Sequence, residues 1–413
     1  MTRKLNYSSF AKLRKSIFAI NYHSVTETSP VREKEKMLML IFVVLIALSY
    51  ASLMIALKKG WSRLETPLYD YETPENRFSI VIPFRNEAEN LPELLESLLL
   101  LNYPLELFEI FLVNDDSADD SEKIISEFIE KQPQFDLKVI QNSRSSNSPK
   151  KDAIKTAIEI SKFDYILTTD ADCKIPQNWL QSFNTEIIKS NPAMIAAPVT
   201  IEVNNPKFGT AFEALDFLSL QISGAGAFGL NRAFMANGAN LCYKKEAFFN
   251  QNGFDGNSDI TSGDDVFLLQ KFIKQQLKVT FLKDKSAVVT TKPLNNFKKM
   301  VQQRIRWASK TSAYTSNFAK LIGIIVFIMN LAFSLSLLLG IFKLFPFPYF
   351  MILFLVKFNV DFVLLYNASQ FFKQESLMRH YMISSVLHPF FSVYVAFLSL
   401  FGGYQWKGRT FKR

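Results

Sequence analysis

Acidic side chains follow two of the short apolar runs in the chain. Asp115 comes directly after the run at residues 109–114. Asp170 and Asp172 come after the run at residues 165–169. An Asp-x-Asp pair at the end of a strand offers two carboxylates to a hard divalent cation and leaves other coordination positions for phosphate oxygens. The same tripeptide also occurs in solvated turns and helix caps, but its position after a strand favours the metal-binding interpretation.

A second pair of acids, Asp264 and Asp265, stands before the apolar segment 266–272. Gly and Asp are favoured at helix N-termini, which gives the pair a purely structural interpretation. The alternative is chemical, because a hydroxyl that attacks a carbon centre needs a general base to accept its proton. We predict Asp265 as this base, with Asp264 as the second candidate.

Farther along, Gln303, Arg306 and Trp307 lie in a basic helical segment that leads to an apolar run. A positive flank with an interfacial Trp is common beside membrane spans. The functional alternative is a clamp, because Arg pairs with a leaving diphosphate and Trp offers a face for a sugar ring.

These residues lie on elements that predict an α/β fold with a mostly parallel sheet. Strands alternating with helices of 10 to 15 residues form βαβ units, and ligands of such sheets gather at the carboxyl ends of the strands. The predicted strands are 78–83, 109–114, 137–141 and 165–169, and the predicted helices between them are 91–101, 121–132 and 152–161.

Long apolar stretches flank this α/β region. Residues 37–57, 321–342 and 381–401 carry no Lys, Arg, Asp or Glu, and 347–371 is interrupted by Lys357 and Asp361. Each is long enough to cross a hydrocarbon core of about 30 Å. We divide the chain into a basic N-terminal segment (1–36, not native if Met37 is the true start), a transmembrane helix (37–57), a catalytic domain ending in an interfacial helix (58–320), a membrane region of two to three spans (321–401) and a basic C-terminal tail (402–413).

The net charge of +9 follows the edges of the apolar stretches, which favours a membrane surface and argues against nucleic acid as a partner. Such flanks predict a multi-pass protein of the cell (inner or plasma) membrane with a cytoplasmic catalytic domain. The two cysteines, Cys173 and Cys242, form no spaced metal motif and indicate a reducing compartment.

Taken together, the motifs resemble the membrane branch of family 2 glycosyltransferases, which includes cellulose, chitin and hyaluronan synthases and ceramide glucosyltransferase. The resemblance covers about residues 75–310. The matching elements, in family order, are Pro83 with Glu87, the Asp115 loop, Lys150-Lys151 before a helix, Asp170-Ala171-Asp172, Asn237-Gly238-Ala239-Asn240, Gly263-Asp264-Asp265 and Gln303-x-x-Arg306-Trp307.

The resemblance implies a GT-A fold, inversion at the anomeric carbon, and a nucleotide-sugar donor, such as a UDP-sugar, bound with Mg²⁺ or Mn²⁺. It also implies a role for each matching residue. Pro83, Glu87 and Asp115 would line the nucleoside pocket with Lys151 near it, Asp170 and Asp172 would serve nucleotide and metal, Asp265 would be the base, and Gln303, Arg306 and Trp307 would hold the diphosphate and the acceptor.

The loop around Asp115 departs from the family pattern: Asp116 stands where relatives often have Gly, and Asn114 where many have Asp. Three functions remain open. The first is transfer of one or a few sugars to a lipid or glycan acceptor. The second is a processive polysaccharide synthase that couples polymerisation to export. The third is a non-catalytic membrane scaffold or sugar receptor, which the complete set of acids argues against.

Overall fold

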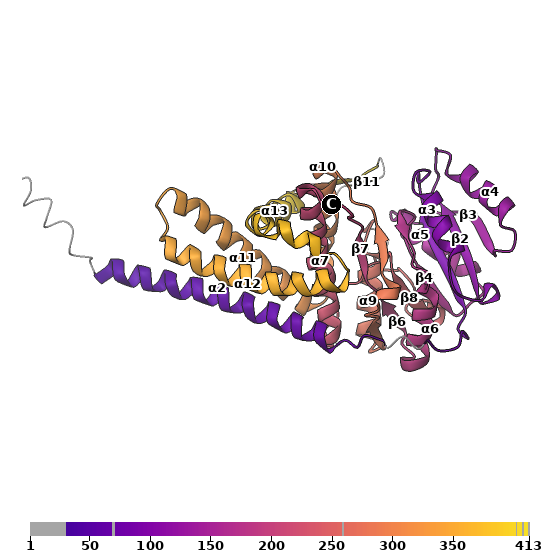
Figure 1. Ribbon diagram of the computed structural model, residues 1–413, viewed down its shortest axis with the longest axis horizontal. Coiled ribbons are helices and arrows are strands. Elements are labelled where there is room, and N and C mark those ends of the chain that lie inside the picture. The colour runs from indigo at the N-terminus through magenta and orange to yellow at the C-terminus, as the bar shows by residue number, and fades with distance from the viewer. Residues whose placement is uncertain (1–29, 68–70, 258–259, 402, 407–408, 412–413) are drawn as a thin grey trace, which may run out of the picture.

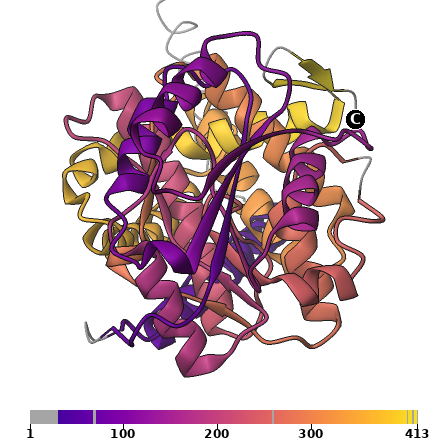
Figure 2. The same ribbon diagram turned by 90° about the vertical axis from the view of Figure 1, so that its right-hand side faces the viewer.

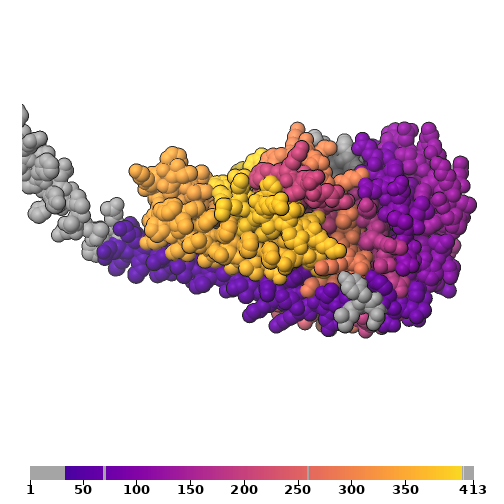
Figure 3. Space-filling model, in the orientation of Figure 1, coloured from indigo at the N-terminus to yellow at the C-terminus, as the bar shows by residue number. Residues whose placement is uncertain are grey.

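The computed structural model describes residues 30–67, 71–257, 260–401, 403–406 and 409–411, and it has an α/β domain joined to a set of long helices (Figures 1 and 3). Most of the basic N-terminal segment (residues 1–29) and part of the basic tail lie outside the described residues. The α/β domain begins at β1 and the long helices lie on one side of it, so the molecule is elongated.

Within the described residues, the α/β domain is built on a seven-stranded sheet of order β3-β2-β1-β4-β8-β6-β9. β1, β2, β3 and β4 are parallel, as the sequence predicts, and β8 joins β4 in antiparallel orientation. The bounds are β1 Phe78–Phe84, β2 Phe108–Asn114, β3 Leu137–Gln141, β4 Tyr165–Thr168, β6 Met194–Ala196, β8 Leu241–Lys244 and β9 Val279–Phe281. A second sheet contains β5 Cys173–Lys174, β10 Val289–Thr291 and β7 Val199–Ile201.

The strand register decides where the loops go. Phe84 at the end of β1 pairs with Asn114 at the end of β2, and Asn114 pairs with Gln141 at the end of β3. Because parallel strands that end in register deliver their following loops to one edge, the acid-bearing loops meet there. Figure 2 looks onto this domain, with the long helices behind it.

Helices cover both faces of the sheet. Alternate residues of β1 point to opposite sides: Ile80 and Ile82 pack in the core that includes α3 and α4, and Val81 packs in the core that includes α5 and α9. The helices of this domain are α3 Leu91–Leu99, α4 Ser121–Lys131, α5 Pro149–Ile160, α6 Trp179–Ser190, α7 Phe208–Gly229, α8 Lys245–Asn250, α9 Asp264–Lys274 and α10 Phe297–Ser309, with 3₁₀ turns at Leu105–Leu107, Lys285–Ala287 and Lys310–Ala313. A further 3₁₀ turn, Glu375–His380, connects two of the long helices that follow this domain. The predicted helix at 152–161 starts earlier, at Pro149, because a proline in the first turn needs no N–H partner.

Four described helices are long and apolar enough to span a membrane: α2 Pro30–Arg63, α11 Asn317–Ile341, α12 Phe347–Phe371 and α13 Tyr381–Phe401. The helix α2 extends beyond the predicted 37–57 at both ends. Figure 1 shows α2, α11 and α12 running along the long axis, whereas α13 crosses them. After α13, the strand β11 (Tyr404–Trp406), which pairs with β12 (Arg409–Phe411), contacts α10, so the described part of the tail returns to the α/β domain.

No local sequence pattern predicts α7, yet this helix connects the two parts of the molecule. It packs against the end of α2 through glycines on both helices. A Cβ at Gly60 would collide with the carbonyl oxygen of Gly226, one at Gly226 with that of Leu57, and one at Gly229 with that of Gly60. The backbones approach so closely because these side chains are absent.

We therefore predict that Gly226→Ala destabilises the protein by roughly 1–3 kcal/mol, since the added methyl group meets rigid backbone. Gly209 is the matched control on the same helix, because a Cβ there meets nothing within 4 Å. Gly209→Ala is expected to leave the unfolding temperature unchanged or raise it. Thermal unfolding of the detergent-purified variants measures both. Equal unfolding temperatures for Gly226→Ala and the parent would contradict the close packing of α2 on α7.

Candidate active site

The carboxylate of Asp115 is held by basic and amide side chains at the end of β2. Arg144 Nε donates to Oδ1 over 2.6 Å, and Asn142 Nδ2 donates to the same oxygen over 2.7 Å. Arg85 donates to the Asp115 carbonyl oxygen. The neighbouring Asp116 has a φ of 64°, a region that favours glycine, and the hydrogen bond from Arg85 together with the charge of Arg144 lowers its pKa.

Pro83 and Glu87 lie at the same edge of the sheet. Pro83 is half-buried near the end of β1 and pairs with Val113 of β2. Glu87 is buried; its backbone N–H donates to Ser121 Oγ, and its Oε2 accepts from Asn90 Nδ2 over 2.7 Å. The structure thus places the three expected nucleoside-pocket residues, Pro83, Glu87 and Asp115, on neighbouring strand ends.

Lys150 connects the Asp-x-Asp loop to the second acid pair. Its Nζ lies 2.6 Å from Asp170 Oδ1 and 3.5 Å from Asp264 Oδ2. Burial acts to lower the pKa of Lys150, but the charges of Asp170 and Asp264 outweigh it and raise the pKa. Asp172 is accessible to solvent yet surrounded by protein, and this desolvation together with the charge of Asp170 raises its pKa. At this edge of the sheet, Lys150 therefore neutralises the carboxylate of Asp170, whereas the charge of Asp172 is poorly compensated.

Lys151, which we expected near the nucleoside pocket, points elsewhere. Its side chain is buried, and Nζ donates to the carbonyl oxygens of Asn257 and Ile260 over 2.7 and 2.8 Å. Burial lowers its pKa to about 8. The contacts give Lys151 a role in holding the segment before Asp264, and Lys150 is the lysine that reaches the carboxylates.

Asp264 and Asp265 open α9 but face different surroundings. Asp264 is buried against Lys150, and although burial acts to raise its pKa, Lys150 and Lys310 lower it. Asp265 Oδ2 accepts from the Gly238 N–H over 3.1 Å, and Oδ1 lies 3.6 Å from Lys310 Nζ. A Cβ at Gly238 would meet Asp264 Oδ2 at 2.7 Å, so a side chain at this position would displace the Asp264 carboxylate.

The segment Gln303-Arg304-Ile305-Arg306-Trp307 lies on α10, but its members face different surroundings. Trp307 faces a cavity, whereas Gln303 accepts a hydrogen bond from Arg304 Nη1. The guanidinium of Arg304 stacks over the Trp307 ring at 4.4 Å. Arg306 is half-buried, and its carbonyl oxygen accepts from Ser309. Of the three residues predicted to hold diphosphate and acceptor, Trp307 is thus the one on the cavity wall.

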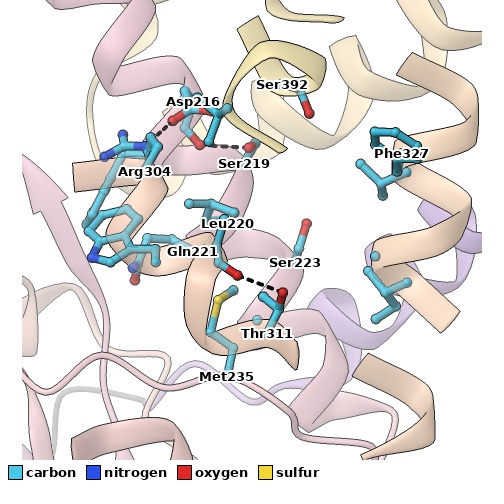
Figure 4. Close-up of a pocket in the computed structure, with 18 of the residues that line it drawn as sticks. Asp216, Ser219, Leu220, Gln221, Ser223, Met235, Arg304, Thr311, Phe327 and Ser392 are labelled. Carbon is cyan, nitrogen blue, oxygen red and sulfur yellow. Dashed lines mark hydrogen bonds and ion pairs between the residues drawn. The ribbon is translucent and has the colours of Figure 1, made fainter. Parts of the chain in front are cut away.

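The cavity has a volume of about 910 Å³ and lies between α7, α10, α11 and α13, with contributions from α2 and α12. Asp265 and Trp307 line it at the α/β domain, and Asn330 and Lys357 line it among the long helices. Figure 4 shows Ser223 and Ser392 pointing into it from α7 and α13, with Phe327 on the opposite wall. Asp264 faces Lys150, so Asp265 is the acid of the pair that meets the cavity.

Sequence reasoning missed several partners of these residues. Arg144 and Asn142 lie in a Ser/Asn-rich loop without periodicity, and Asp216 lies on the unassigned helix α7, so no local signal marked them. Lys150 was recognised only as part of a pair with Lys151. Which of the two lysines reaches the carboxylates depends on the face of α5 that packs on β1 and β2.

A divalent cation fits the chemistry of the Asp-x-Asp loop. Asp170 and Asp172 supply hard oxygen ligands, and the raised pKa of Asp172 indicates a charge that a cation would stabilise. Among the described residues, no group of three or more His, Cys, Asp or Glu could hold a metal by itself. A cation bound by Asp170 and Asp172 would therefore need further ligands, and substrate phosphates usually supply them for Mg²⁺.

Comparisons with known proteins identify the family and the fold of the chain. A family model described as glycosyl transferase family 21 matches residues 39–412. The glycosyltransferase AglE of Haloferax volcanii is 24% identical over 229 residues, covering 55% of this chain and 70% of that relative. A hyaluronan synthase of Streptococcus pyogenes is 34% identical over 140 residues, but the match spans only 33% of its length and 32% of this chain.

Among solved structures, a mannosyltransferase from Pyrobaculum calidifontis in complex with GDP-Man and Mn²⁺ is similar, with a TM-score of 0.57 and 14% identity, covering 85% of this chain and 99% of that one. At this identity the likeness concerns the fold, which is of the GT-A type. The fold and the resemblance to membrane-bound family 2 glycosyltransferases expected from the sequence are both confirmed.

We predict that Asp172 is a metal ligand, so Asp172→Asn should greatly weaken metal-dependent nucleotide binding and abolish turnover while the domain stays folded. Asp164→Asn is the matched control, because Asp164 is exposed at the opposite end of β4. Calorimetric titration with and without Mn²⁺ measures the nucleotide affinity of both variants. Metal-dependent affinity that is the same in Asp172→Asn and the parent would exclude Asp172 as a ligand.

Proposed function

Because the chain belongs to glycosyl transferase family 21, we propose that this glycosyltransferase moves a sugar from a nucleotide donor, such as a UDP-sugar, onto a lipid acceptor at the membrane, with inversion. The observation that carries the proposal is the cavity, which extends from Asp265 and Trp307 into helices long enough to span a bilayer. An acceptor with acyl or prenyl chains can therefore present its hydroxyl to Asp265 without leaving the membrane.

The carboxyl edge of the sheet is the proposed donor site. Pro83, Glu87 and Asp115 would surround the nucleoside, with Arg85 and Arg144 keeping the edge electrostatically balanced. Asp172 and Asp170 would hold Mg²⁺ or Mn²⁺, which would neutralise the charge that develops on the leaving diphosphate. The mannosyltransferase of similar fold was solved with GDP-Man and Mn²⁺, which supports a metal-bound nucleotide sugar as donor. Lys150 lies close enough to Asp170 to add positive charge there.

Asp265 is the proposed base. The acceptor oxygen attacks the anomeric carbon as the bond to the diphosphate oxygen breaks, and the hydroxyl proton passes to the Asp265 carboxylate. The Gly238 N–H fixes one carboxylate oxygen, and Lys310 lies near the other, so the group is oriented toward the cavity. A single displacement of this kind inverts the anomeric configuration. Trp307 would contact the sugar or the acceptor, and Gln303 and Arg306 would hold the diphosphate.

The alternative is a processive synthase, which the Gln303-x-x-Arg306-Trp307 motif favours. The cavity wall supports the first proposal, because Phe217, Phe327, Leu215 and other apolar side chains dominate it. A hydrated glycan needs hydrogen-bonding groups along its path, whereas apolar walls suit hydrocarbon chains.

We further propose that the catalytic domain faces the cytoplasm, where nucleotide sugars are made. α2, α11 and α12 then span the membrane, and α13 lies across them, so that the C-terminal tail returns to the catalytic side. In this proposal, the divisions at residues 37–57, 58–320 and 321–401 separate span, catalytic domain and membrane region.

Cysteine labelling tests this orientation. Asn257→Cys lies before α9, and Gly403→Cys lies just after α13. Both are expected to react with a membrane-impermeant maleimide only when the cytoplasmic face is exposed. Labelling of Asn257→Cys from outside intact cells would contradict the proposed cytoplasmic orientation. Labelling of the two cysteines from opposite sides of the membrane would show that α13 crosses it.

The activity itself is tested with a panel of radiolabelled UDP-sugars and GDP-mannose, Mg²⁺ or Mn²⁺, and phosphatidylcholine vesicles that contain either diacylglycerol or polyprenyl phosphate. We expect one donor to transfer its labelled sugar to one of the two lipids, and the lipid product to carry one or a few sugars. Long polymer as the sole product would favour the processive alternative. Release of soluble labelled sugar without any labelled lipid or polymer would exclude both transfer to lipid and processive synthesis.

In the same assay, Asp265→Asn is expected to lower transfer by about 10²–10⁴-fold, the usual contribution of a general base, while nucleotide binding persists. Asp255→Asn, an exposed acid of the segment before α9, serves as the control and should retain full activity. Near-normal transfer by Asp265→Asn would move the base elsewhere, with Asp264 as the first candidate.

A further inference from the structure

A buried charged cluster joins three helices at the wall of the cavity. Asp216 of α7 accepts from Arg304 Nε of α10 over 2.6 Å through one oxygen. Its other oxygen lies 2.9 Å from His388 Nε2 of α13. Burial acts to raise the pKa of Asp216, but the charge of Arg304 and the hydrogen bond from His388 lower it to about 2. Because an ionised carboxylate only accepts hydrogen bonds, His388 Nε2 carries the proton in this contact.

The same cluster continues into the motif on α10. Arg304 stacks on the Trp307 ring and donates to Gln303, so the position of its guanidinium fixes two residues expected to meet substrate. Arg304 is 95% buried, and its Nη2 has no hydrogen-bond partner among the described residues. Rotation of this buried side chain would separate its charge from Asp216, which is strongly unfavourable. Asp216 therefore determines where Arg304, and with it Trp307, can lie.

His388 is held in place by aromatic packing. Its ring contacts Phe212 of α7, whose ring packs edge-on against Phe391 of α13 at 5.4 Å. Phe297 of α10 packs on Phe391 as well. These aromatic contacts fix the three helices of the cluster to one another. The hydrogen bond from His388 then orients the Asp216 carboxylate within this interface.

We infer that His388 is a positioning residue for sugar transfer: through Asp216 it fixes Arg304 and Trp307 at the acceptor end of the cavity. Part of the inference, the effect on acceptor use, rests on the proposed function. The effect on Trp307 does not, because it depends only on the contacts among α7, α10 and α13. The helix α13 then contributes to the active site and is more than an anchor to the membrane.

Two substitutions separate the hydrogen bond from the packing. His388→Phe keeps an aromatic ring against Phe212 and Phe391 but cannot donate to Asp216. His388→Gln keeps a donor. His380 provides the matched control, because its Nε2 lies 3.1 Å from the Pro206 carbonyl oxygen and its ring contacts Phe208, outside the cluster. All variants are made in the full-length protein and compared by thermal unfolding first.

The first readout is kinetic and uses whichever lipid of the vesicle panel the parent labels best. His388→Phe is expected to raise the KM for that lipid about tenfold, the effect of losing a hydrogen bond to a charged group, with donor hydrolysis in lipid-free detergent unchanged. His388→Gln should recover most of the loss, and His380→Phe should behave as the parent. A role that only stabilises the fold would lower hydrolysis and transfer together and would not distinguish Gln from Phe.

The second readout needs no substrate. The chain has four tryptophans, so ¹⁹F spectra of protein labelled with 5-fluorotryptophan are simple, and Trp307→Phe assigns the resonance of interest. We expect His388→Phe to shift or broaden the Trp307 resonance, and His388→Gln and His380→Phe to leave it in place. An unchanged Trp307 resonance in His388→Phe overturns the inference. If the parent labels no lipid while Trp307 still responds to His388→Phe, the proposed acceptor fails and the positioning role stands.

Discussion

The close contact between α2 and α7 is the constraint on which the rest of the structure depends. Glycines at residues 60, 226 and 229 let the two backbones meet, so the first long helix is fixed directly to the α/β domain. The same helix α7 also lines the cavity, through Asp216 and Ser223 among others. One helix therefore holds the long helices in place and forms a wall of the proposed acceptor site. A looser contact would separate Asp265, the proposed base, from the membrane that would supply its acceptor.

The second constraint is electrostatic. The ends of β2 and β4 bring Asp115 and Asp170 to one edge of the sheet, and the N-terminus of α9 brings Asp264 there, where unbalanced carboxylates would repel each other. Basic side chains balance all three of these acids directly, since Arg144 pairs with Asp115 and Lys150 lies between Asp170 and Asp264. Asp172 is left with a raised pKa. In the proposed function, a donor that arrives with a divalent cation would supply the missing positive charge, so the arrangement that stabilises the domain would also prepare it for a metal-bound nucleotide.

Much of this could be predicted from the sequence because local patterns determine it. Short β-branched runs and the helices between them predicted β1 to β4 in order. Long apolar stretches predicted α11, α12 and α13 within a few residues, although Lys357 and Asp361 interrupt the stretch of α12. The helix α7 could not be predicted in this way, because its residues pack on α2, α12 and the sheet at once and carry no single apolar face. The exchange between Lys150 and Lys151, and the pairing of Asp216 with His388 across 172 residues of sequence, depend on tertiary contacts that no local pattern encodes.

The central claim is that the cavity between α7, α11 and α13 holds the acceptor, and chemical blockage of the cavity tests it most directly. Ser223→Cys places a thiol in the cavity wall, while the native Cys173 and Cys242 are buried. Alkylation with a bulky maleimide should abolish sugar transfer to lipid and leave donor hydrolysis intact, and alkylation of Ser126→Cys on the exposed side of α4 should change neither. Undiminished lipid glycosylation by fully alkylated Ser223→Cys would contradict the account.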